Sequence, residues 1–298
     1  MKKVLILMST YNGEKYLKDQ IESILQQTYK YIDVLVRDDG STDGTASILN
    51  HYQDLGKLKW YSGNNLKPAR SFMDLVNNCD STYDFYAFAD QDDIWLPNKI
   101  EKAVLQLTND TKPALYYCAT NNVTSELEHI DFYFRNPKAA KSFKTSLKTG
   151  CLIPGCTMVF NNLLLMNIRK YNPQYIGMHD IWLHIVCLAI GGAVYADEQP
   201  YIQYRQHSNN AVGSKKRGFA YRIKRFFGKP HDFSSVAKEI LIGYGDEIND
   251  DSKVFLESNS NYLNNFKCYK YCLFDKCFDG ANLNEIILYK LKIIFKVF

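Results

Sequence analysis

The chain has little net charge and no long apolar run. Its 36 Lys and Arg against 32 Asp and Glu leave a net charge of +4, too small to indicate nucleic acid as a partner. No segment approaches the roughly 20 apolar residues of a membrane-spanning helix. The apolar run within MKKVLILMSTYN at the start of the chain is also too brief for a signal peptide. These absences predict a cytoplasmic protein.

No Cys-x-x-Cys pair occurs among the eight cysteines, which argues against a zinc site of the usual spacing. Most of these cysteines fall inside apolar runs, where the residue behaves as a small hydrophobe. We therefore expect reduced, structural thiols, as is usual in the cytoplasm.

Hydrophobic residues make up 46% of the chain, which fits a globular protein with a substantial core. The first 119 residues alternate between two kinds of segment. Short apolar runs predict strands at 4–8, 33–38, 58–61, 84–89 and 114–119, and helical spacing predicts helices at 15–27, 41–52, 68–78 and 96–107. This alternation predicts an α/β fold with a parallel sheet, whose ligands bind beyond the carboxyl ends of the strands.

The second part of the chain is less regular. Residues 120–150 are polar and show no clear periodicity, whereas 156–168 predict a strand followed by a helix. An apolar helix headed by Asp180 is expected at 179–192, and a strand leading into a loop at 201–213. The composition changes from Ser214 onward, so we place a domain boundary there.

Two acid clusters follow predicted strands. The stretch AFADQDDIWLP (87–97) places Asp90, Asp92 and Asp93 within four residues, and two such charges 4 Å apart repel by roughly 4 kcal/mol at an effective dielectric near 20. Water or a bound cation could offset this cost. Two interpretations remain open: carboxylates that hold a divalent metal against a phosphate, or Asp92 or Asp93 as N-cap of the helix whose first turn holds Pro97.

The other cluster, RDDGSTDG (37–44), imitates the start of an EF-hand calcium loop. Asn50 stands where that loop needs a bidentate Glu, and a strand precedes the cluster instead of a helix. In the 90–101 stretch, Trp95 replaces the required Gly. We therefore reject calcium loops at both places, and an ordinary strand-to-helix turn remains the alternative for 37–44.

Four segments together resemble glycosyltransferase family 2: STYNGEKYL, VRDDGSTDGT, FADQDDIWLPNKI and HDIWL, in this order and spacing. The resemblance extends to about Gly213. It implies a GT-A fold, a nucleotide-binding α/β sandwich with a mainly parallel central sheet. It also implies a glycosyltransferase domain at 1–213, with a nucleotide-sugar-binding half (1–119) and an acceptor-binding half (120–213), followed by a helical, basic extension at 214–298.

The resemblance assigns a role to each of several residues. It implies that Asp38 or Asp39 contacts the base of the nucleotide and that Asp90 lies nearer the ribose. The full set of residues expected to line the nucleotide pocket is Thr10, Tyr11, Asn12, Asp38, Asp39, Arg70 and Asp90. Lys67 stands where the family commonly has glycine. Asp92 would bind the divalent metal, Mn or Mg, together with His207 on a loop that in the family closes over the diphosphate. Asp93 is adjacent.

Asp180 matches the family's catalytic base, which takes the proton of the acceptor hydroxyl. An inverting displacement needs this base on the face opposite the leaving group, so it must come from a different segment than the metal motif. Without the resemblance, an N-cap role for Asp180 would be equally open.

The expected reaction is inverting transfer of one sugar to a lipid-linked glycan in bacterial surface polysaccharide or capsule synthesis. Processive synthases carry Gln-x-x-Arg-Trp and membrane spans, whereas this chain has QYRQH at 203–207. The segments GCTMVFN and YRQHSNNAVG resemble a rhamnosyltransferase subgroup, which implies dTDP-rhamnose as donor, and UDP-hexoses remain open. Two alternatives are a nucleotidyltransferase, although STYNGEKYL lacks its Gly-rich basic loop, and a non-catalytic adaptor for membrane or nucleic acid.

Residues 214–230 carry seven Lys or Arg, no acid and four aromatic side chains, Phe219, Tyr221, Phe226 and Phe227. This pattern favours an anionic membrane surface over nucleic acid, for which no recognition motif is present. The apolar end, residues 286–298, could pack on the body, pair with another subunit in a homo-oligomer, or add to a membrane face. We expect a peripheral protein on the inner face of the cell membrane.

Overall fold

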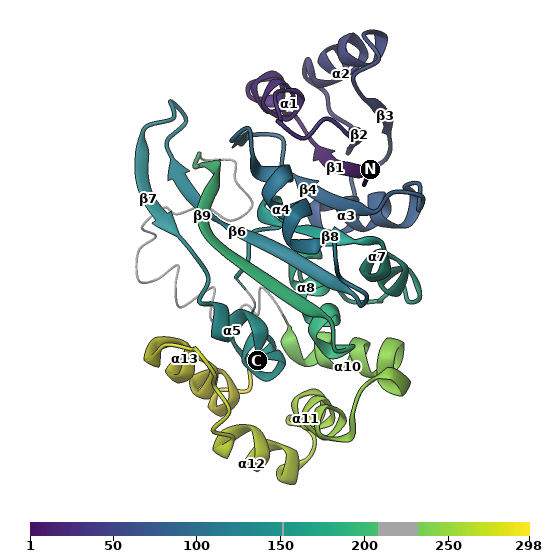
Figure 1. Ribbon diagram of the computed structural model, residues 1–298. Coiled ribbons are helices and arrows are strands. Elements are labelled where there is room, and N and C mark those ends of the chain that lie inside the picture. The colour runs from purple at the N-terminus through teal and green to yellow at the C-terminus, as the bar shows by residue number, and fades with distance from the viewer. Residues whose placement is uncertain (151, 208–231) are drawn as a thin grey trace.

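A computed structural model describes residues 1–150, 152–207 and 232–298. One twisted sheet crosses the molecule and helices cover both of its faces (Figure 1). The strands are β1 (Val4–Thr10), β2 (Ile32–Asp38), β3 (Lys59–Ser62), β4 (Phe85–Ala89), β5 (Ile94–Trp95), β6 (Ala114–Val123), β7 (His129–Tyr133), β8 (Val159–Asn161) and β9 (Ala193–Arg205).

The α-helices of the first 207 residues are α1 (Leu17–Leu25), α2 (Thr45–Asp54), α3 (Lys67–Asn78), α4 (Lys99–Leu107), α5 (Pro137–Lys141), α6 (Phe143–Thr149), α7 (Asn162–Arg169) and α8 (His179–Ala189). Those after residue 231 are α10 (Phe233–Tyr244), α11 (Asp250–Asn261), α12 (Phe266–Phe274) and α13 (Leu283–Ile294). Two short 3₁₀ turns are η1 (Gly155–Thr157) and η2 (Gly245–Glu247). No helix in the described part of the chain is long and apolar enough to cross a membrane.

The strand order is β3-β2-β1-β4-β8-β6-β9-β5, with β7 paired to β6. The first four strands of this order are parallel, as the alternation of the first half predicts. Beyond β4 the sheet is mixed, because β8 runs antiparallel to both β4 and β6 while β6 and β9 are parallel. In sheets of this kind, ligands bind beyond the carboxyl ends of the strands, next to the point where the strand direction changes, which here is at β4 and β8.

Alternate residues of β1 enter two different cores, because successive side chains of a strand point to opposite faces. Val4, Ile6 and Met8 pack with α1, α2 and α4, whereas Leu5 and Leu7 pack with α3, α7 and α8. Burial on both faces explains why the strand is a continuous apolar run and not an alternating one.

The parallel register brings the predicted motifs together. Thr10 is the partner of Asp38, and Met8 is the partner of Ala89, so the segments that follow β1, β2 and β4 leave the sheet at the same edge. These segments carry the STYNGEKYL, RDDGSTDG and DQDD sequences.

Residues 120–150 contain more structure than their sequence indicates. Strand β6 continues to Val123, and β7, α5 and α6 follow. Strand β7 is exposed from His129 to Phe132, so its sequence shows none of the alternation that a buried face would impose.

Helices α10 to α13 lie together at one end of the molecule, next to α5 (Figure 1). Phe233, Ile240, Phe255 and Tyr289 are buried in the same core as α8. Arg135 pairs with Glu285, which also fixes α13 to the segment between β7 and α5. The apolar end of the chain therefore packs on the body through part of its surface. The predicted basic segment at 214–230 lies outside the described residues.

Candidate active site

A cavity of about 520 Å³ opens at the carboxyl edge of the sheet. Its wall is formed by the turn after β1, the loops after β2 and β4, strand β6, the turn η1 and the start of α8. Six polar side chains that line it are Tyr11, Asp39, Lys67, Asp90, Asp92 and Asp180. Besides Tyr11, four residues predicted for the site therefore line one cavity. They come from the loops after β2 and β4 and from α8, and they are Asp39, Asp90, Asp92 and Asp180.

The turn after β1 is held rigidly. The Thr10 hydroxyl donates to Asp38 Oδ1 at 2.9 Å, and Asn12 adopts φ 48°, a left-handed conformation that asparagine tolerates. Gln91 holds the Tyr11 backbone on both sides, accepting from its N–H at 2.8 Å and donating to its carbonyl at 3.1 Å. The Tyr11 side chain remains 47% exposed at the cavity, whereas Thr10 and Asn12 do not line it.

The two acids at the end of β2 have different surroundings. Asp38 accepts hydrogen bonds from Thr10 and from the backbone and hydroxyl of Ser41, and it does not line the cavity. Asp39 does line it, paired with Arg37 and accepting the backbone N–H of Lys67 at 2.9 Å. The sequence left open which of the two would contact the base, and only Asp39 lines the cavity.

Arg70 is not brought to the cavity. Its guanidinium donates to the carbonyl oxygens of Pro173 and Gln174 at 2.9 and 2.8 Å. Three residues earlier, Lys67 lines the cavity and adopts φ 66°, in the left-handed region that favours glycine. The departure from the family's glycine therefore places a cation at the cavity wall, which the sequence analysis did not recognise.

Asp92 and His207 meet although they are far apart in the chain. His207 Nε2 lies 2.8 Å from Asp92 Oδ2, and both side chains are mostly buried. The imidazole stacks on Tyr16 with ring centroids 4.9 Å apart. Asp92 lines the cavity, and its carboxylate and the neighbouring imidazole could together hold a divalent metal whose other coordination positions phosphate oxygens would fill.

Arg205 connects β9 to the DQDD loop. Its backbone N–H donates to the buried Asp93 at 3.1 Å, and its Nε donates to the Asp92 carbonyl at 2.8 Å.

The N-cap interpretation of Asp92 and Asp93 is wrong, because β5 intervenes and α4 starts only at Lys99. The acids therefore belong to the cavity and the loop that borders it.

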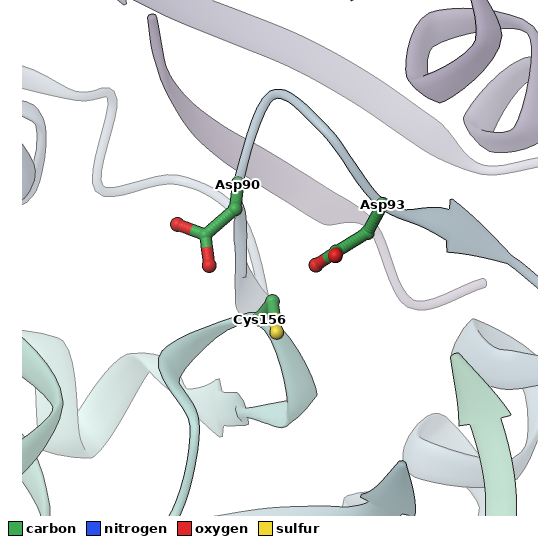
Figure 2. Close-up of side chains that lie close together, drawn as sticks. All are labelled: Asp90, Asp93 and Cys156. Carbon is green, nitrogen blue, oxygen red and sulfur yellow. The ribbon is translucent and has the colours of Figure 1, made fainter. Parts of the chain in front are cut away.

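A second group of possible ligands lies beside this loop. Figure 2 shows Asp90 and Asp93 at the two ends of the loop after β4, with Cys156 of η1 near both, and their ligand atoms lie within 4.8 Å of one another. Burial and the charges of Asp93 and Asp90 raise the pKa of the Cys156 thiol well above its ordinary value. Mn and Mg also prefer oxygen ligands to sulfur. Asp92 and His207 offer a carboxylate and an imidazole that could hold a divalent metal without a thiol.

Asp180 lies in the first turn of α8, where the helix N-cap is Met178, so it is not the N-cap itself. One of its carboxylate oxygens, Oδ1, accepts the N–H of Ile181 at 2.7 Å. Burial raises the pKa of Asp180 to about 6, while backbone hydrogen bonds oppose that shift. Burial and the charges of Asp92 and Asp180 likewise raise the pKa of Asp90. The carboxyl group of Asp180 is thus suited to exchange a proton near neutral pH.

His179 precedes this acid and also lines the cavity. Its ring stacks on Phe72 with centroids 4.0 Å apart, and neither ring nitrogen has a hydrogen-bond partner. Burial lowers the pKa of His179 to about 3, so the imidazole is neutral. A Cβ on Gly155 would come within 2.4 Å of His179 Nε2, which explains the glycine there.

Three comparisons agree with this geometry. The family model "Glycosyl transferase family 2" matches residues 5–165. The dTDP-rhamnosyl transferase RfbG of Shigella flexneri is 30% identical over 232 residues, which are 70% of this chain and 74% of RfbG.

Two solved structures show the same fold. The crystal structure of S. aureus TarS 1-349 in complex with UDP-GlcNAc superposes with a TM-score of 0.61 at 15% identity, covering 99% of this chain and 80% of that one. The mannosyltransferase PcManGT from Pyrobaculum calidifontis, in complex with GDP-Man and Mn²⁺, gives 0.53 at 17% identity, covering 99% and 81%. The chain has the GT-A fold and belongs to glycosyl transferase family 2.

Proposed function

We propose that this glycosyltransferase is metal-dependent, inverting and non-processive, and that it transfers one rhamnose from dTDP-rhamnose to a lipid-linked glycan in bacterial surface polysaccharide synthesis. The observation that carries this proposal is the convergence of Asp92, beside His207, and Asp180 on one cavity from separate elements. The donor diphosphate would require the metal held by Asp92 and His207, and the acceptor hydroxyl would require Asp180 as its base.

The donor's nucleoside part would occupy the end formed by Tyr11 and Asp39. The exposed ring of Tyr11 offers a stacking surface, and the Asp39 carboxylate accepts hydrogen bonds from a base. Asp90 would accept from the ribose hydroxyls, and the Lys67 ammonium would attract the diphosphate.

Asp92 in the DQDD loop and His207 after β9 would be the protein ligands of the divalent metal. When bound, Mn or Mg would neutralise charge on the diphosphate leaving group. Arg205 keeps the loop at the distance from β9 that lets these two side chains meet.

Asp180 would act as the general base. Its carboxylate takes the proton of the acceptor hydroxyl while that oxygen forms a bond to the anomeric carbon. The bond from this carbon to the diphosphate oxygen breaks, and the electron pair leaves with the diphosphate. Attack from the side opposite the leaving group inverts the anomeric configuration.

The donor assignment is supported by RfbG, whose name gives a dTDP-rhamnosyl activity. It is also supported by an apolar part of the cavity wall close to Asp180, formed by Phe72, Ile153, Pro154 and Met178. Apolar contacts accommodate the methyl group of a 6-deoxy sugar better than the hydroxymethyl group of a hexose.

A donor screen tests the proposal. Thermal shift is measured with dTDP-rhamnose, UDP-glucose and UDP-GlcNAc at equal concentration, each with and without Mn²⁺, since at a given concentration a ligand with a lower Kd stabilises the protein more. We expect the largest shift with dTDP-rhamnose and Mn²⁺, and NMR of the transfer product should show the inverted anomer. A larger shift with a UDP-hexose would show that dTDP-rhamnose is not the preferred donor. A product with the anomeric configuration of the donor would contradict the inverting mechanism.

A further inference from the structure

Helix α13 is apolar on two opposite faces, and only one of them is covered. Tyr289 and Ile293 point into the core and are buried. We define the outer face of α13 by five exposed side chains: Leu283, Ile287, Leu288, Leu291 and Ile294. Leu283 is 70% exposed and Ile294 is 48% exposed. A spacing of three and four residues gathers these side chains into one stripe.

Helix α12 adds aromatic side chains to the same end of the molecule. Phe266 and Phe274 are 71% and 70% exposed and lie eight residues apart, with Lys270 midway on the same face. The Lys270 ammonium lies 4.6 Å from the Phe266 ring centroid. Large exposed apolar side chains on two helices that contact one another are typical of an interaction site.

The exposed charges of the chain segment that carries this surface have one predominant sign. From residue 262 to the end of the described chain, the exposed lysines are Lys267, Lys270, Lys276 and Lys296. Two of the three acids in that stretch are mostly buried and paired, Asp275 with Lys148 and Glu285 with Arg135. Asp279 is the single exposed acid there.

We propose that the outer face of α13, together with α12, binds the surface of an anionic membrane. Exposed Phe and Leu side chains beside lysines are typical of helices that lie in a lipid interface, and each basic residue near such a surface strengthens binding roughly fivefold. A second copy of the chain is a poorer occupant, because two-fold pairing would bring the same four lysines of each copy together. This inference deepens the proposed function, since a lipid-linked acceptor lies in a membrane.

Vesicle co-sedimentation of the full chain tests the inference. The vesicles contain phosphatidylcholine alone, or equal parts of phosphatidylcholine and phosphatidylglycerol. The variant Ile287→Ser/Leu291→Ser/Ile294→Ser should lose more than about tenfold in affinity for the anionic vesicles, because it removes apolar contact area. The control Leu55→Ser/Leu105→Ser/Leu163→Ser changes exposed leucines on other surfaces and should bind as the wild type does.

A charge variant provides a second arm that leaves the apolar side chains in place. Replacing Lys267, Lys270, Lys276 and Lys296 with Gln should weaken binding to anionic vesicles by at least about tenfold. Thermal shift with the donor is recorded for every variant and should be unchanged, which separates membrane binding from the proposed transfer. Wild-type binding by the triple serine variant would overturn the inference. The inference would also be overturned if the wild type formed a dimer that does not bind vesicles and the triple serine variant were monomeric.

Discussion

His207 Nε2 lies 2.8 Å from Asp92 Oδ2, although 115 residues separate the two in the chain. Strand β9 makes this possible, because it pairs with β5 immediately after the DQDD loop and returns the chain to that loop. The DQDD loop and the end of β9 therefore form one unit at the cavity.

Replacing Asp180 with Asn should reduce transfer by at least about a thousandfold, because the amide cannot accept the proton of the acceptor hydroxyl. The substitution keeps the size of the side chain, so donor affinity should change less than about threefold. Transfer is measured by product formation and donor binding by calorimetry. Near-normal turnover in this variant would remove Asp180 from the mechanism.

The pH dependence follows from the same carboxyl group. Burial raises the pKa of Asp180 to about 6, and the base acts only when ionised, that is, above its pKa. We expect kcat/KM to rise about tenfold per pH unit below 6 and to level off above it. A steady-state profile at fixed, saturating Mn²⁺ checks this. A flat profile down to pH 5 would contradict the assignment.

Replacing Lys67 with Gly should separate stability from donor binding. The native φ of 66° suits glycine, so the free energy of unfolding should fall little or rise by up to about 1 kcal/mol. Loss of the ammonium group should raise the donor KM by about tenfold, with a smaller change in kcat. Lys57→Gly, a change at an exposed lysine away from the cavity, is the control. Equal effects of the two changes would exclude a donor contact for Lys67.

A methyl group on Gly155 should disturb the cavity through His179. The added Cβ would come within 2.4 Å of His179 Nε2 in a packed environment, so Gly155→Ala should cost about 1–3 kcal/mol of stability and lower activity. Gly245→Ala is the matched control, because nothing lies within 4 Å of its added Cβ and its φ is negative. Chemical denaturation and transfer assays distinguish the two. Equal stability of the two variants would mean that the contact with His179 is easily relieved.

Much of the fold could be predicted where local pattern and tertiary structure agree. The strands β1 and β4 are apolar runs because both of their faces are buried, and the acids that follow β2 and β4 mark the cavity edge. Strand β7 was not predicted, because its residues are mostly exposed and its sequence therefore lacks the alternation of apolar and polar residues that a buried face produces. The antiparallel pairing of β8 depends on contacts between distant segments, which no local pattern encodes.

The candidate site shows the same division. Asp39, Asp90, Asp92 and Asp180 were identified from their motifs, and all four line the cavity. The direction of a long side chain was not predictable, because it depends on partners remote in sequence. Arg70, for example, turns toward the backbone of residues 173–174. Gln91 was also missed, since its hydrogen bonds with Tyr11 become visible only when two loops are brought together.

The most direct test of the account measures donor binding by calorimetry with and without Mn²⁺, in the wild type and in Asp92→Asn. If Asp92 holds the cation that binds the donor diphosphate, Mn²⁺ should strengthen binding of the nucleotide sugar to the wild type by at least about tenfold. This gain should disappear in Asp92→Asn and persist in Asp54→Asn, which changes an exposed acid on α2. Equal donor affinity with and without the metal, or a full gain in Asp92→Asn, would contradict the claim that this acid holds the cation.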